Sequence, residues 1–359
     1  MEEYRLELEA MDFPLRSPGS IAEYCESWLK LREGSYGPSR TAEREALDVR
    51  HIVELSPNAK LRSLTAPMIH AAYDEARASG RFGKEICQIN KRLRQILDAA
   101  VEDGLIKKNP ARKVSVARPD PEPKDYLDPP RLAAFNAAVL AMPWCGEKIA
   151  TLILLHTEIR PGEVYAFSWA DLSFARCRLD VSRQYSNDME LRRPKSRASI
   201  DWVAVDSALW SHLAEWKLAQ RDPLARVGVE QHQDTPIVTN SLGGRFDPTN
   251  FGRWFRNFCA DNGFGEYSVV EKTFVRNGKT IVRGKGYKGL CPNMFRDIQA
   301  TAMVGYLDAD PRTLQARMRH SDPSISLRYY THPVEDNEYR VAEGFAQMIE
   351  GRSESTAAL

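Results

Sequence analysis

The chain has 359 residues, with 50 lysines and arginines against 49 aspartates and glutamates, and a formal net charge of +1. Hydrophobic residues make up 43% of it, which is ordinary for a protein with a packed core, and the length allows two domains. No run of about eighteen apolar residues occurs, and the N-terminus has no basic stretch before an apolar one. These features exclude a membrane span and a secretory signal, and they predict a cytoplasmic protein.

The six cysteines are scattered along the chain without a Cys-x-x-Cys pair, at Cys25, Cys87, Cys145, Cys177, Cys259 and Cys291. This spacing argues against a structural zinc site and against a disulfide framework. It predicts reduced, mostly buried thiols and no bound metal.

The first third of the chain is predicted to hold a short acidic segment, 1–17, and a helical domain, 18–117. Apolar residues recur there with helical spacing. Four helices are expected, starting at Ile21, Ser39, Leu64 and Glu85, with the fourth reaching Asp103. Gly104 is the expected C-cap of the fourth helix, and Asn109-Pro110 is expected to end the following turn. Four such helices are also compatible with a generic bundle.

A proline-rich stretch, R-P-D-P-E-P-K-D-Y, predicts an extended linker over 118–125. The following domain, 126–333, is expected to be mainly helical with a small sheet. Alternating residues in 171–185 and 198–205 indicate strands on either side of a turn. A glycine turn at Gly243-Gly244 should precede another helix. The tail, 334–359, predicts a helix with one apolar face formed by Val341, Phe345, Met348 and Ile349.

Positive charge is concentrated in a few places although the net charge is near zero. Such clusters predict contacts with DNA phosphates. The candidates are Lys91, Arg92, Arg94, Lys107, Lys108, Arg197, Arg276, Lys279, Arg283 and Lys285. The last four lie around Asn277-Gly278, a strong hairpin signal, within an insertion at 264–288. An edge ribbon with solvated charges is an equally good interpretation of this insertion.

Four segments stand out by their charged and polar residues. In chain order they are T-E-I-R-P-G-E-V-Y-A-F-S-W-A-D from Thr157, R-P-K-S-R-A-S around Lys195, P-N-M-F-R-D-I-Q-A-T from Pro292, and R-M-R-H-S-D-P-S-I-S-L-R-Y-Y-T-H from Arg317. Together they supply Arg160 with Glu163, Lys195, Asn293 with Arg296, His320, and the pair Tyr329-Tyr330. Lys195 lies in a charge run, so Arg193 or Arg197 is an alternative phosphate contact.

These residue types suit the breaking and rejoining of a DNA phosphodiester without metal or nucleotide. Arginine binds phosphate through a planar fork and stays charged, so Arg160 and Arg296 predict a clamp on the transition state. A tyrosine phenolate gives a covalent phosphotyrosine that keeps the bond energy for religation. Lys195 is the candidate general acid for the leaving 5′ oxygen, and His320 would bind the phosphate or help deprotonate the tyrosine.

The four segments, in this order, resemble the motifs of the tyrosine recombinase, or phage-type integrase, family. The first box of that family usually reads Thr-Gly-x-Arg-x-x-Glu, followed by Leu-x-Trp-x-Asp. The resemblance implies a mainly α fold with a small β-sheet: an N-terminal helical core-binding (SAM-like) domain and a C-terminal catalytic domain. It also implies a site-specific recombinase that needs no cofactor and acts as a homotetramer on double-stranded DNA with paired sites. The tail would then be exchanged between protomers, docking on a neighbour; packing against its own domain is the alternative.

The nucleophile and the activity each leave alternatives open. The family places its tyrosine nine or ten residues after the histidine, and the letters I-S-L-R-Y-Y-T-H favour Tyr330 over Tyr329. Asn293 stands where the family usually has histidine, and Asp297 where many members have His or Lys. A DNA-binding protein with a degenerate site, or a type IB topoisomerase-like enzyme, is therefore an alternative to the recombinase. The sequence also leaves open the target site, the biological task and a directionality factor.

Overall fold

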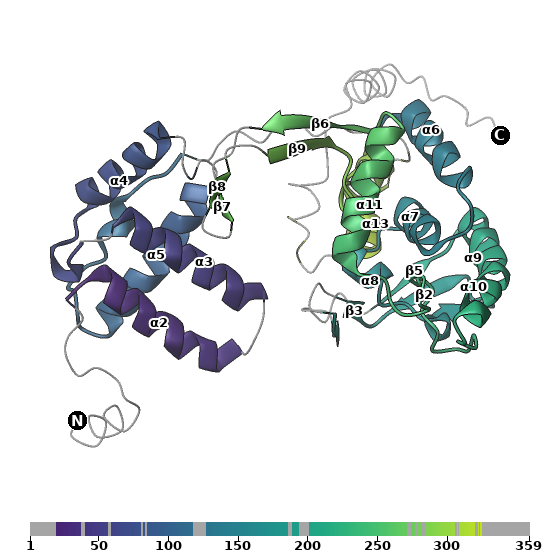
Figure 1. The fold of residues 1–359 in the computed structure, drawn as a ribbon, viewed down its shortest axis with the longest axis horizontal. Helices are drawn as coiled ribbons and strands as arrows, with labels where there is room; N and C mark the ends of the chain where they lie inside the picture. The colour runs from purple at the N-terminus through teal and green to yellow at the C-terminus, as the bar shows by residue number, and fades with distance from the viewer. Residues whose placement is uncertain are drawn as a thin grey trace, which may run out of the picture. The chain divides into compact units, whose positions relative to one another are not determined.

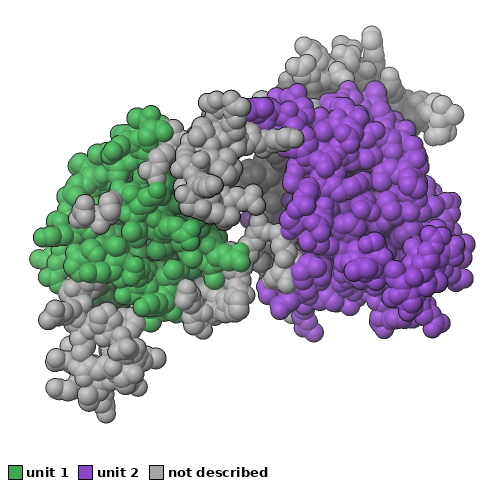
Figure 2. All heavy atoms as spheres, viewed as in Figure 1, with its two compact units in different colours: residues 1–123 green, residues 124–359 purple. Residues whose placement is uncertain are grey.

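The computed structural model describes residues 19–36, 40–56, 59–79, 82, 85–117, 127–185, 189–193, 201–270, 274–276, 279–281, 284–305, 307, 309–319, 322 and 324. The chain divides into two compact units, residues 1–123 and 124–359 (Figures 1 and 2). Each unit has a hydrophobic core of its own. The division falls inside the segment predicted as a linker, 118–125, which lies outside the described residues.

Unit 1 contains the four helices expected from the sequence. They are α2 (Ile21–Tyr36), α3 (Arg40–Leu55), α4 (Ala66–Ala78) and α5 (Glu85–Glu102), with short 3₁₀ helices at η1 (Leu61–Ser63) and η2 (Pro110–Lys113). Helix α4 begins later than predicted because Thr65 caps it, its hydroxyl accepting a hydrogen bond from the Met68 amide, and Pro67 occupies the first turn. The amphipathic pattern therefore located the helices well, and the cap fixed the boundary.

Helix α5 supplies much of the core of unit 1. Its buried apolar residues recur every three or four positions, at Ile86, Ile89, Leu93, Ile96, Leu97 and Ala100. Gly104 ends the helix as predicted, with a φ of 71°, and the next amide, of Leu105, donates to the Ala100 carbonyl at 3.0 Å. Asn109-Pro110 follows the turn after Gly104, as predicted, and the pair also begins η2, where the Asn109 side chain accepts a hydrogen bond from the Ala111 amide at 2.9 Å.

Unit 2 is built around a central helix, α7, which Figure 1 shows in the middle of the unit. The helices are α6 (Pro129–Leu140), α7 (Gly146–His156), α8 (Pro161–Val164), α9 (Ser207–Ala219), α10 (Arg221–Arg226), α11 (Pro248–Asp261), α12 (Met294–Gly305) and α13 (Pro311–Met318), with a 3₁₀ turn, η3 (Trp169–Asp171). Helix α7 is buried over most of its length, including every residue from Lys148 to Leu154, as expected for a helix that is apolar on most of its surface. An added Cβ at Gly146 would lie 2.1 Å from the Thr239 carbonyl oxygen, so only glycine fits.

Two small sheets lie on either side of the segment that holds Lys195. Strands β1 (Leu172–Ser173), β2 (Arg178–Val181) and β5 (Asp201–Ala204) form an antiparallel sheet in the order β1-β2-β5, with Leu179 opposite Val203. Strands β3 (Gln184–Tyr185) and β4 (Leu191–Arg192) form the other. The predicted strands around this turn are thus confirmed, while Lys195 itself lies outside the described residues.

The insertion after α11 forms two-stranded ribbons. Strand β6 (Gly265–Val270) pairs antiparallel with β9 (Gly284–Gly289), and β7 (Phe274–Arg276) pairs with β8 (Lys279–Ile281) on either side of Asn277-Gly278. The hairpin predicted from that dipeptide is confirmed. At the base of β6–β9, Tyr287 packs edge-on against Tyr267 and its hydroxyl donates to the Leu290 carbonyl at 2.9 Å. This anchors the ribbon next to the start of α12.

Two further findings concern the remaining sequence predictions. Within the part of the chain that the structure describes, no helix is long and apolar enough to cross a membrane. All six cysteines are free, but only Cys25 and Cys259 are buried, so the prediction of mostly buried thiols is wrong. Cys177 and Cys291 are exposed because they lie in loops rather than on the apolar face of a helix.

Phe135 offers a test of the aromatic core beneath the second arginine box. It is fully buried, and its ring lies 5.0 Å from that of Phe264 and 5.2 Å from that of Phe295, the residue before Arg296. We expect Phe135→Ala to lower the free energy of unfolding of unit 2 by about 3–5 kcal/mol, measured by urea denaturation followed by near-UV circular dichroism. Leu140→Ala, on the same helix but 38% exposed, is the control and should cost about 1 kcal/mol or less. Equal losses in the two variants would contradict this account of the core.

Candidate active site

The first arginine box forms a tight turn after α7. Arg160 occupies the N-cap of α8 with extended backbone angles, and Pro161 takes the first helical position. The Glu163 carboxylate accepts hydrogen bonds from the Arg160 amide at 2.9 Å and from its guanidinium at 3.2 Å. Glu163 is 2% exposed whereas the Arg160 side chain is 38% exposed. The buried carboxylate therefore orients an arginine that still reaches solvent.

The backbone that follows the box is held by Arg245. Its guanidinium donates to three successive carbonyls, of residues 165 to 167, at 3.0, 2.7 and 3.2 Å, and to the Ser168 hydroxyl at 2.8 Å. Burial lowers the pKa of Arg245 from its ordinary value, but an arginine stays charged at any working pH. Asp171, the last residue of the motif, accepts from the Ser168 amide and pairs with Arg183. Together these contacts make the box a rigid platform.

The second arginine box starts helix α12. The Arg296 amide donates to the Asn293 carbonyl at 3.2 Å, which sets up the first turn. Arg296 is 3% exposed, and its Nη2 donates to the Met318 carbonyl at 2.8 Å. Asn293 itself has an exposed side chain. The buried Arg296 thus binds the end of α13, whereas Asn293 of the same box is exposed.

The end of helix α13 is the meeting point of the two boxes. Arg319 follows the helix in a left-handed conformation, and its Nη2 lies 2.5 Å from Glu163 Oε2. Two residues earlier, Arg317 pairs with the buried Glu158 at 2.7 and 2.8 Å. These contacts join segments about 160 residues apart in the sequence. The structure therefore brings Arg160, Glu163 and Arg296 to the residue that directly precedes His320.

Several predicted site residues lie outside the described part of the structure. These are Lys195, Arg197, Arg283, His320 and Tyr330. Their roles stay predictions, supported by the placement of their neighbours in sequence. Arg276, Lys279 and Lys285 are placed on the ribbon strands β7, β8 and β9 respectively. Among the described residues, no group of histidine, cysteine and acidic side chains is arranged to hold a metal ion.

Arg92 has a place in unit 1 that differs from a surface contact. It is 8% exposed, and its guanidinium pairs with Glu45 at 2.7 Å and with Asp48 at 3.4 Å. Burial would raise the pKa of Glu45, but its pairs with Arg32 and Arg92 hold that pKa below its ordinary value. The ring of Trp28 also lies under Arg32, 4.7 Å away. Arg92 therefore stabilises the helical unit, and we do not include it in the proposed DNA surface.

The other basic candidates of unit 1 divide between structure and surface. Arg94 donates to the carbonyls of Ala111 and Val114 and so fastens η2 to α5. Lys91, Lys107 and Lys108 are exposed. The three lysines are thus the members of this set whose charge is available to a phosphate.

Three contacts of the site were not found from the sequence. They involve Arg245, the Glu158–Arg317 pair and Arg319. Glu158 stands where the resembled pattern has glycine, and this departure was a visible signal that the position does something different here. Arg245 and Arg319 gave no signal, because a single arginine in a turn or before a histidine has no periodicity or spacing that sets it apart.

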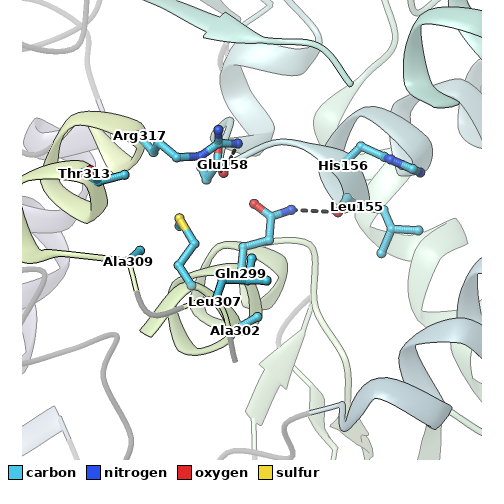
Figure 3. Close-up of a pocket in the computed structure, with 10 residues that line it drawn as sticks. Leu155, His156, Glu158, Gln299, Ala302, Leu307, Ala309, Thr313 and Arg317 are labelled. Atoms are coloured by element: carbon cyan, nitrogen blue, oxygen red, sulfur yellow. Dashed lines mark hydrogen bonds and ion pairs between the residues drawn. The ribbon is translucent and has the colours of Figure 1, made fainter. Parts of the chain in front are cut away.

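A pocket of about 370 Å³ lies between α7, α12 and α13, beside the site (Figure 3). Its lining is mostly apolar and includes Met303, Leu307 and Ala309. At one end Glu158 pairs with Arg317, and Gln299 reaches the backbone at its side, donating to the Leu154 and Leu155 carbonyls at 3.0 and 2.7 Å. Glu158 Oε2 and Gln299 Oε1 are buried and have no hydrogen-bond partner among the described residues.

No family model matches the chain. In sequence it is 22% identical, over 295 residues, to a protein named tyrosine recombinase XerC-like from Caldanaerobacter subterraneus subsp. tengcongensis, covering 77% of this chain and 69% of that relative. In structure it is similar to the Tn1549 transposon integrase in complex with a circular intermediate DNA, with a TM-score of 0.71 and 16% identity, over 91% of this chain and 99% of the other. It is also similar in structure to a lambda integrase tetramer bound to a Holliday junction, with a TM-score of 0.59 and 15% identity, over 86% of this chain and 79% of the other.

The fold, a helical unit followed in the sequence by a mainly helical unit with small sheets, is similar to that of the Tn1549 and lambda integrases. It is the tyrosine recombinase fold, as the motifs predicted. The resemblance to that family is confirmed by a relative in sequence and by neighbours in structure. The order and placement of the two arginine boxes fit it.

The different settings of Lys91 and Arg92 can be separated by experiment. We expect Lys91→Ala, which removes an exposed charge, to weaken DNA binding a few-fold and to lower the slope of log affinity against log salt by about 1. Arg92→Met leaves Glu45 and Asp48 short of a buried partner, and should cost about 3 kcal/mol of unfolding free energy in unit 1. Salt titrations of DNA binding and urea denaturation measure the two effects. The assignment is wrong if Arg92→Met keeps full stability and loses DNA binding alone.

Proposed function

We propose that the chain is a site-specific DNA recombinase, an integrase that cleaves and rejoins DNA through a 3′-phosphotyrosine intermediate. The convergence of the two arginine boxes carries this proposal. Glu163 binds both Arg160 and Arg319, and Arg296 binds the backbone two residues before His320. The meeting of these segments, which are far apart in the sequence, supports a phosphate clamp formed by Arg160 and Arg296.

Arg160 suits the role of the first phosphate ligand. The Glu163 carboxylate binds both the amide and the partly exposed guanidinium of Arg160. The Arg160 side chain therefore loses little conformational freedom when DNA binds. Fixed donors aimed at the non-bridging oxygens act on charge that is spread over them in the transition state. Arg160 therefore stabilises the transition state more than it stabilises the ground-state complex with DNA.

The reaction needs one nucleophile and one acid. The Tyr330 oxygen attacks the scissile phosphorus, its proton passing to a base such as His320, and the bond from phosphorus to the 5′ oxygen breaks. Lys195 gives the leaving oxygen a proton, so a 5′ hydroxyl is released. A 5′ hydroxyl from another duplex then reverses the step, and two such exchanges pass through a Holliday junction. No oxidant, nucleotide or metal is consumed.

The departures from the family pattern at Asn293 and Asp297 are compatible with an active enzyme. The exposed Asn293 amide can donate to a phosphate oxygen, although it cannot titrate near neutral pH. Asp297 is only 9% exposed and lies in the first turn of α12, where the helix dipole favours a carboxylate. Because Asp297 is buried, we infer that it has a structural role and does not replace a residue that contacts DNA. The degenerate DNA-binding protein and the topoisomerase-like enzyme are thereby alternatives with less support.

Covalent capture tests this chemistry. Nicked suicide duplexes taken from DNA that flanks the gene should form an adduct on Tyr330, located by mass spectrometry. The adduct should survive Tyr329→Phe, vanish with Tyr330→Phe, and form about 100-fold more slowly with Arg160→Ala. If DNA that the protein demonstrably binds gives no adduct, the result favours the hypothesis of a DNA-binding protein with a degenerate active site. If any plasmid is relaxed without a specific site, the topoisomerase reading is correct.

The partner we propose is double-stranded DNA with paired recombination sites, on a mobile genetic element. The exposed lysines of unit 1, and Arg276, Lys279 and Lys285 on the ribbon, supply charge for phosphate contacts that do not depend on sequence. A directionality factor would be a further partner. The edge-ribbon interpretation predicts instead that charge removal on β7 and β8 leaves the affinity for DNA unchanged.

The tail at 334–359 is proposed to dock on a neighbouring protomer in a homotetramer, and the pocket of Figure 3 is its proposed acceptor. The apolar face predicted for the tail would suit the apolar part of this pocket, which includes Met303 and Leu307. On the predicted helix Arg340 would border that face, and it is the one basic residue of 333–350. The buried Glu158 Oε2 has no partner among the described residues, so an arriving guanidinium would satisfy it.

Removing the charge at Arg340 should therefore affect assembly and not the binding of a site. We expect Arg340→Met to lower the yield of recombined product about tenfold, with the affinity for a single site kept within about twofold. Arg352→Met, farther along the tail, is the matched control. Gel-shift assays and product yields on paired sites provide the readout. An Arg340→Met protein that recombines as well as the control rules out this acceptor.

A further inference from the structure

Arg319 has an unusual backbone conformation for a buried charged residue. Its φ and ψ are 52° and 49°, in the left-handed region that L side chains seldom adopt. The other described non-glycine residues with positive φ are Phe82, Cys177 and Met189, and none of these is buried. Arg319 is 3% exposed. Such a conformation persists only where surrounding contacts over-determine it, and it is often found at a functional site.

A buried contact of the Arg319 side chain is its ion pair with Glu163. The Nη2–Oε2 distance is 2.5 Å, and the two side chains are 1% and 2% exposed. The other carboxylate oxygen, Oε1, accepts from Arg160 at 3.2 Å. One buried carboxylate is thus shared by two arginines, one of which is buried while the other reaches solvent. In a site of low dielectric such charges interact strongly.

The charge balance of this trio decides what Arg160 can offer a phosphate. Glu163 alone would neutralise Arg160, so the pair would present little net charge to the non-bridging oxygens. With Arg319 present, the trio keeps a net charge of one positive unit, because two guanidiniums face one carboxylate. The only partly exposed member is Arg160, so the surplus charge is presented there.

We propose that Arg319 is a positioning residue that neutralises Glu163, so that Glu163 orients Arg160 without cancelling its charge. This inference rests on the proposed recombinase function. It explains why a non-glycine residue is kept in a left-handed conformation directly before His320. The rival explanation is that Arg319 only stabilises the end of α13, in which case its charge has no particular effect on the chemistry.

Arg319→Gly separates the two explanations, because glycine suits the left-handed backbone while the charge is lost. We expect single-turnover cleavage of a suicide duplex to fall about 100-fold, with DNA affinity changed by about twofold or less. A duplex with a methylphosphonate at the scissile position carries no charge on that group. On it the loss should shrink to about tenfold or less, since less charge has to be stabilised.

Two further variants keep the test decisive if Arg319→Gly folds poorly. Arg319→Lys retains the charge and should cleave within about tenfold of the natural protein. Adding Glu163→Gln to Arg319→Gly removes the carboxylate that Arg319 neutralises, and should recover most of the lost rate. Thermal unfolding of each variant gives its stability alongside the rates.

The outcomes distinguish the inference from the function on which it rests. The inference is overturned if Arg319→Gly cleaves at the rate of the natural protein. It is also overturned if the rate defect is equal on both substrates and is not relieved by Glu163→Gln, because that result would indicate a purely structural role. If the unsubstituted protein forms no covalent adduct with DNA that it binds, the proposed function fails and this inference fails with it.

Discussion

The buried carboxylate of Glu163 is the interaction on which the site depends. It closes the turn of the first arginine box through the Arg160 amide, orients the Arg160 guanidinium, and holds Arg319 at the end of α13. A buried charge is tolerated only when it is paired and hydrogen-bonded, and here three donors from two distant segments satisfy it. The local turn and the long-range contact are therefore stabilised together.

The surrounding elements fix this carboxylate in place. Central helix α7 delivers the box, Arg245 clamps the backbone after it, and Arg296 ties α12 to the same end of α13. The aromatic cluster around Phe135 lies beneath α12, so the position of Arg296 depends on core packing. The catalytic arrangement is in this sense an extension of the core of unit 2, and not a set of surface residues.

Much of this arrangement was predictable from the sequence, for identifiable reasons. Arg160, Glu163 and Arg296 lie in motifs with fixed spacing, and the helices of unit 1 have a clear apolar periodicity. The burial of Arg92 was not predictable, because periodicity does not reveal that Glu45 and Asp48 on another helix face it. Arg245 and Arg319 were missed for the same reason: their partners are 80 and 156 residues away. Sequence patterns report local geometry, whereas partners for buried charges come from tertiary contacts.

The separate cores of the two units have a consequence for engineering. The buried residues of unit 1 form one cluster and those around α7 another, and Arg92 finds its partners Glu45 and Asp48 within unit 1. A chimera that receives the helical unit of a relative as a whole block would leave the Glu163–Arg319 pair of unit 2 intact, and it would not divide a network such as Glu45–Arg92 between two parents. Retargeting by block exchange at the 118–125 segment is thus less disruptive than grafting single basic residues, some of which, like Arg92 and Arg94, are structural.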